Sequence, residues 1–108
     1  MKLMTKSLAG LIVSAFLAPA ALATGPEVFT AQKCNSCHSV KVAGIARLPN
    51  PDDDKAPDLS KVGAELDKKA IALFVLKKSE IKGEKHKKAF QGTTEELKTV
   101  AEWLAGLK

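Results

Sequence analysis

Two cysteines and a histidine lie close enough together in this chain to hold an iron-containing cofactor. The stretch Cys34-Asn35-Ser36-Cys37-His38 has the Cys-x-x-Cys-His spacing of covalent haem attachment. The two thiols can add to the two vinyl groups of a porphyrin, and the adjoining imidazole can bind one axial face of the iron. The motif therefore predicts one covalently bound haem c, attached at Cys34 and Cys37 and bound through its iron by His38.

Three other interpretations of the same cysteines are weaker. A thioredoxin-like redox pair requires a strand–helix setting that the sequence does not show. A zinc site requires further cysteine or histidine ligands, and the only other histidine is His86. A structural disulfide between cysteines as close as Cys34 and Cys37 is uncommon. Haem attachment is therefore the favoured chemistry of the motif.

The first 23 residues have the pattern of an export signal. Lys2 and Lys6 form a positive start, residues 8–17 are almost wholly apolar, and Ala21-Leu22-Ala23 is a small-x-small cleavage site. The apolar run is shorter than the roughly 20 residues that cross a bilayer comfortably. We therefore expect residues 1–23 to be removed as a signal peptide, which leaves a periplasmic protein without a stable membrane anchor. An uncleaved anchor is the alternative.

Residues 24–108 are expected to form one domain that depends on its cofactor. A domain of this size buries modest apolar surface and often needs an additional stabilising group. Here the covalently bound haem would be that group. The segment has 15 basic and 12 acidic residues, and a net charge of +3 is too small an excess to indicate nucleic-acid binding. Clustered lysines can still steer an acidic redox partner protein, or they can simply solvate the surface. The lysines expected around the haem edge are Lys33, Lys41, Lys82, Lys85, Lys87 and Lys88.

Three helices must position these groups. The first is predicted over about 26–33, with Val28 and Phe29 facing inward. The second is predicted over 67–78, with an apolar stripe that contains Ile71, Phe74, Val75 and Lys78.

The third helix is expected to begin at a capping box formed by Thr93 and Glu96. Trp103 lies beside its apolar stripe and is expected to pack near Phe29. Residues 39–56 are predicted to form a solvated loop. Its Asp52-Asp53-Asp54 run favours a turn over a calcium site, because calcium loops space their ligands along the chain.

These features together resemble the class I cytochrome c family, over nearly all of residues 24–108. The resemblance is carried by Cys34–His38, by Ala56-Pro57-Asp58-Leu59 with Val62-Gly63, and by Phe90-Gln91-Gly92-Thr93 leading into the last helix. It implies an all-α, cytochrome c-like helical fold around one haem, with the first and last helices crossing. It also implies that the Pro57 region packs on the proximal side, where a backbone carbonyl orients His38.

The chain departs from the family at the second axial ligand. The family places a methionine about three residues before the phenylalanine, where this chain has Lys87, and its only methionines lie in the export segment. His86 is the neighbouring residue, and neutral imidazole is a good iron ligand, whereas a lysine amine must first lose a proton. We expect His86 to be the sixth ligand. The alternatives are Lys87 or another group, and an open or water-bound iron.

Two functions follow from these ligand sets. Iron held by His38 and His86 can exchange one electron without making or breaking bonds, which predicts electron transfer. A labile or open sixth position would instead suit a haem-based sensor or a small-ligand-binding protein. No group other than His86 could act as a general base beside an open iron, so the chain is not expected to be an enzyme.

Overall fold

The computed structural model describes residues 23–49 and 56–108, and these residues form a small helical domain. Its α-helices are α2 (Gly25–Ala31), α3 (Lys68–Val75) and α4 (Thr94–Ala105). Short 3-10 turns occur at Cys34–Ser36, Lys41–Ala43 and Val62–Ala64. The described residues contain two isolated β-bridges and no strand, so the all-α prediction is confirmed. The predicted signal peptide, up to residue 22, and the Asp52-Asp53-Asp54 turn lie outside the described residues.

The first and last helices begin at capping boxes. In α2, the Thr24 hydroxyl accepts a hydrogen bond from the Glu27 N–H, and the Glu27 carboxylate accepts one from the Thr24 N–H at 2.8 Å. In α4, Thr93 and Glu96 make the same reciprocal pair, as the sequence predicts. Each box satisfies two N–H groups that a helix start leaves without partners. The helix starts are therefore specified locally.

Helix α3 is shorter than the sequence predicts. Asp67 caps its start by accepting a hydrogen bond from the Ala70 N–H at 2.8 Å. The helix ends at Val75, and Lys77 adopts a left-handed backbone with φ of 62°. Lys78 is consequently exposed beyond the helix, and its predicted place on the apolar face of the helix is wrong.

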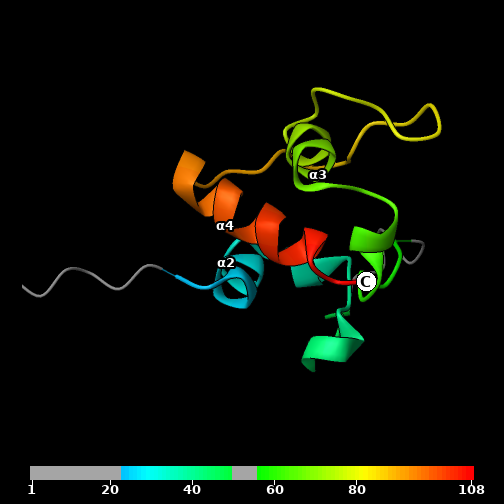
Figure 1. Ribbon diagram of the computed structural model, residues 1–108. Coiled ribbons are helices and arrows are strands. Elements are labelled where there is room, and N and C mark those ends of the chain that lie inside the picture. Colours follow the sequence, from blue (N-terminus) through cyan, green and yellow to red (C-terminus); the bar gives the residue numbers. More distant parts are fainter. Residues whose placement is uncertain (1–22, 50–55) are drawn as a thin grey trace, which may run out of the picture.

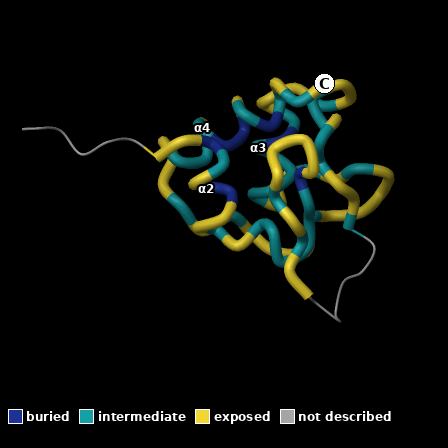
Figure 2. Tube along the Cα trace, turned by 90° about the horizontal axis from the view of Figure 1, so that it is seen from below, coloured by how far each residue is buried: buried dark blue, intermediate teal, exposed yellow. Residues whose placement is uncertain are grey.

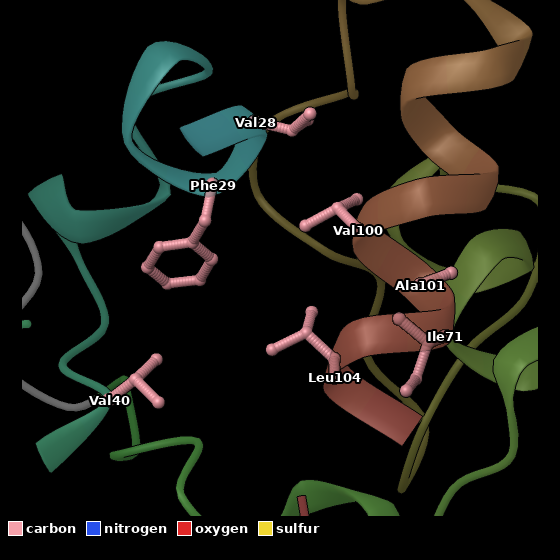
Figure 3. Packing of buried hydrophobic residues seen from close by; sticks show 7 residues of the cluster. All are labelled: Val28, Phe29, Val40, Ile71, Val100, Ala101 and Leu104. Atoms are coloured by element: carbon pink, nitrogen blue, oxygen red, sulfur yellow. The ribbon is translucent and has the colours of Figure 1, made fainter. Parts of the chain in front are cut away.

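The core lies where α2 and α4 cross (Figure 1). The rings of Phe29 and Trp103 meet edge to face with centroids 5.7 Å apart, which confirms the predicted contact. Gly25 allows this close crossing, because a Cβ atom there would lie 2.2 Å from the Cβ of Trp103. Figure 3 shows the buried side chains gathered between these helices and α3. They are Val28, Phe29, Val40, Ile71, Val100, Ala101 and Leu104.

The segment after the haem motif is mostly solvated, as expected, but it has one buried residue. Val40 is fully buried and forms an isolated bridge with Ile45. Most of the other described residues of the segment are exposed, namely residues 41–44, 46, 48 and 49. Figure 2 shows that the other buried residues lie on the three helices. Among the described residues, no helix has the length and apolar character needed to cross a membrane.

Candidate haem site

Two imidazole rings from distant parts of the sequence lie close together in the structure. The ring centroids of His38 and His86 are 6.2 Å apart, and the ring planes are within 8° of parallel. When two imidazoles bind one iron from opposite sides, each metal–nitrogen bond is about 2 Å long and each ring nitrogen lies about 1.1 Å from the centre of its ring. The two ring centroids are then about 6 Å apart. The spacing of the two rings therefore fits one iron ion bound between them.

The haem-attachment motif forms a tight turn that precedes the first imidazole. The backbone N–H groups of Cys37 and His38 both donate to the Cys34 carbonyl, at 3.2 and 3.0 Å. Both cysteines are half-buried. Burial raises the pKa of the Cys34 thiol to about 11, because this side chain packs against the core. The turn thus presents two thiols and one imidazole from a few consecutive residues.

The proximal imidazole is oriented by the backbone of a distant segment. His38 Nδ1 donates a hydrogen bond to the Pro57 carbonyl, with a distance of 2.7 Å. Because a carbonyl can only accept, Nδ1 of the ring carries a proton, which leaves Nε2 as the atom for metal binding. Such a bond fixes the tautomer and raises the basicity of a metal-binding histidine. The contact implied by the family resemblance is therefore present in the structure.

A carboxylate ties this distant segment to the motif. We call residues 57–60 the proximal strap. Asp58 accepts hydrogen bonds from the Ser39 hydroxyl at 2.7 Å, from the Lys41 N–H at 2.9 Å and from the Ser60 N–H at 3.1 Å. The bond from Ser39 is the main reason that the pKa of Asp58 lies well below its usual range, and the Lys41 N–H adds to it.

The second imidazole lies in an exposed segment between α3 and α4, residues 77–90, which we call the distal loop. His86 Nδ1 donates to the Lys88 carbonyl at 2.5 Å, so this ring also carries its proton on Nδ1. The edge of the ring meets Phe74 of α3, with centroids 5.2 Å apart and planes at 70°. These two contacts orient His86 toward the motif.

A reverse turn and two hydrogen bonds shape the distal loop. Lys82 and Gly83 both have positive φ, at 53° and 82°, and they connect the bridged residues Ile81 and Glu84. This pattern matches a type I′ turn, which favours glycine. At the end of the loop, the Phe90 N–H donates to Val75 of α3 at 2.8 Å. Lys77 Nζ also donates to the Lys87 carbonyl at 3.3 Å.

The structure brings the candidate residues of the sequence into one region. His38 contacts Pro57 and lies beside His86, and the cysteines occupy the turn before His38. Sequence reasoning missed the role of Asp58 and the contact of Phe74 with His86. The position of Asp58 next to Pro57 was a possible signal, because Ser39 holds the matching position next to His38.

Fold and site together define a small all-α protein built to hold haem through two thioethers. A family model described as Cytochrome c matches residues 22–108, and the chain belongs to the cytochrome c family. No curated protein and no solved structure matches the chain. Membership of this family makes the chain a haem-binding electron-transfer protein with covalently bound, iron-containing haem c.

Proposed function

We propose that the chain is a periplasmic electron carrier whose haem iron is bound by His38 and His86. The observation that carries this proposal is the pair of nearly parallel imidazoles 6.2 Å apart. The bound haem supplies one-electron exchange at its iron, and the protein supplies position, burial and charge. The proposed role is electron transfer without enzymatic activity.

The hydrogen bonds of both rings support the same ligand assignment. The Pro57 and Lys88 carbonyls hold the protons on the two Nδ1 atoms. Each ring therefore presents Nε2 as the atom that can bind iron.

Lys87 remains the alternative sixth ligand, because it occupies the family's methionine position. Its side chain is exposed, whereas His86 is half-buried beside His38 and Phe74. Moving Lys87 to the iron would require the loop to rearrange around the hydrogen bond from Lys77 to its carbonyl. This geometry favours the histidine.

Spectroscopy of the holoprotein tests the ligand pair. Two histidines predict low-spin, six-coordinate iron in both oxidation states. Nearly parallel imidazole planes also predict a rhombic electron paramagnetic resonance spectrum with three resolved g values in the ferric protein. A high-spin ferric spectrum would contradict bis-histidine ligation and favour an open or water-bound position.

The location is proposed from the export pattern of residues 1–23. Haem-containing chains recovered from a periplasmic fraction should begin near Thr24. Mass spectrometry of the intact protein would show one haem and the loss of the first 23 residues. Holoprotein that retains these residues in the membrane fraction would support the uncleaved anchor instead.

An acidic redox protein is the proposed partner. The segment 77–88 contains six exposed lysines and two glutamates, a net charge of +4, while the rest of residues 24–108 has a net charge of −1. The positive field is therefore concentrated around His86, where it can steer an acidic surface toward the distal side.

Salt and paired variants test this docking surface. The association rate with the native partner should fall steeply as ionic strength rises, because exposed charges are screened beyond ~8 Å at physiological salt. The double change Lys85→Gln, Lys87→Gln should slow association more than Lys33→Gln, Lys41→Gln, which lies outside the segment. If both double variants slowed association equally, the lysines of segment 77–88 would be solvating groups and not a docking surface.

A second function has one observation in its favour. His86 is oriented by a hydrogen bond within its own loop and by the ring contact with Phe74. A displaced imidazole would leave room for a small neutral ligand, as in a haem-based sensor. Rapid and reversible carbon monoxide binding by the reduced protein would support this function, whereas slow binding supports the electron carrier.

A further inference from the structure

Two neighbouring residues of the haem motif lie beside two neighbouring residues of the proximal strap. His38 donates to the Pro57 carbonyl at 2.7 Å, and Ser39 donates to the Asp58 carboxylate at the same distance. The Leu59 N–H returns a hydrogen bond to the Ser39 carbonyl at 2.9 Å. The orientation of the imidazole is thus linked to how firmly residues 39 and 58 are joined.

Asp58 is the residue at which the hydrogen bonds of this region converge. One carboxylate oxygen accepts from Ser39 and from the Lys41 N–H, and the other accepts from the Ser60 N–H. Ser60 in turn accepts from the Val42 N–H at 3.0 Å. Removal of this one side chain would therefore loosen the junction, because only the Leu59–Ser39 and Val42–Ser60 bonds would still join the strap to residues 39–42.

We propose that Asp58 is a positioning residue for the proximal ligand, because it locks the Pro57 carbonyl onto Nδ1 of His38. The inference rests on the proposed role of His38 as an iron ligand. A firm bond to the carbonyl raises the basicity of the imidazole. The charge of Asp58 acts in the same direction, since its three donors are neutral groups that leave its negative charge in place. Both effects stabilise oxidised iron, so Asp58 lowers the reduction potential.

Three variants of the holoprotein separate positioning from stability. Asp58→Ala removes every bond of the carboxylate. Asp58→Asn keeps one acceptor oxygen for Ser39 and Lys41 but loses the charge. The matched control is Asp67→Ala, which removes a carboxylate that caps α3 and lies outside both the strap and the motif. Melting temperature, reduction potential and the exchange rate of the His38 Nδ1 proton are measured for each, the last by nuclear magnetic resonance of the ferric protein.

The expected result is specific to Asp58. Its change to alanine should raise the reduction potential and speed exchange of the Nδ1 proton about tenfold, the scale of losing one hydrogen bond. Asparagine should give an intermediate effect, and the Asp67 variant should change the melting temperature alone. If Asp58→Ala does not fold, Ser39→Ala breaks the same link more gently and should show the same two changes.

The inference would be overturned if Asp58→Ala lowered the melting temperature as much as the Asp67 variant does but left the reduction potential and the proton exchange rate at their wild-type values. A different failure would point to the ligand assignment itself. If the ferric wild-type protein shows no iron-shifted Nδ1 proton from His38, this histidine is not the proximal ligand, and the inference is overturned together with the proposed function.

Discussion

The proximal and distal imidazoles are held in opposite ways. His38 is oriented by a carbonyl 19 residues away, in a strap that Asp58 and Leu59 tie to the motif. His86 donates to a carbonyl only two residues away, within its own exposed loop. Groups held by long-range contacts move only when a larger unit opens, whereas exposed loops open at low cost. We therefore expect the proximal ligand His38 to stay bound to the iron and the distal ligand His86 to dissociate more easily.

The largest difference should appear when each histidine is removed. His38→Ala should abolish accumulation of folded holoprotein, because it deletes the ligand that the strap orients. His86→Ala should still accumulate with one covalent haem, since both thioethers and the proximal ligand remain. Absorbance of haem per purified chain measures both outcomes. Equal losses in the two variants would contradict the asymmetry.

A change in the shared core should act on both sides alike. Gly25→Ala places a Cβ atom against the Trp103 side chain and should destabilise the protein by about 1–3 kcal/mol, the usual cost of overpacking. Chemical denaturation of the holoprotein measures this cost. Below the unfolding transition, the haem spectrum should stay that of the wild type, because α2 and α4 carry neither imidazole. A changed spectrum there would show that the crossing of these helices also positions a ligand.

Two glycines offer a sharper comparison of the two sides. Gly44, near the proximal strap, and Gly83, in the distal loop, have φ of +73° and +82°, and a Cβ at either meets no atom within 4 Å. Alanine at each should cost about 1–2 kcal/mol through backbone strain alone. Only Gly83→Ala should speed carbon monoxide binding to the reduced protein, because only Gly83 lies in the loop that carries His86. Equal binding rates in the two variants would contradict a locally held distal ligand.

The smallest expected effect is the pH dependence that Asp58 contributes. Its pKa is lower in the folded protein than its ordinary value of 3.8, so its stabilising effect is present above that value and is lost as the pH falls below it. The difference in unfolding free energy between wild type and Asp58→Asn should therefore persist at neutral pH and shrink in acid. Because the carboxylate is exposed, the difference should be small. A difference that grows in acid would contradict the hydrogen-bond network.

The sequence specified the helices and the proximal motif because their signals are local. The Thr93–Glu96 capping box, an apolar stripe and the Cys34–His38 spacing each occupy a short stretch of the chain. The end of α3 was misplaced because its apolar pattern continues past the left-handed residue Lys77. The role of Asp58 was missed because its partners Ser39 and Lys41 are brought to it only by the fold. Burial of Val40 was missed for the same reason.

The sixth ligand is tested most directly by the spectra of two neighbouring variants, His86→Ala and Lys87→Ala. If His86 binds the iron, His86→Ala should convert the ferric protein from a low-spin to a high-spin or mixed-spin spectrum at neutral pH. Lys87→Ala should keep the low-spin spectrum of the wild type. Bis-histidine ligation would be contradicted if His86→Ala kept the low-spin spectrum and Lys87→Ala lost it. Lys87 would then be the sixth ligand.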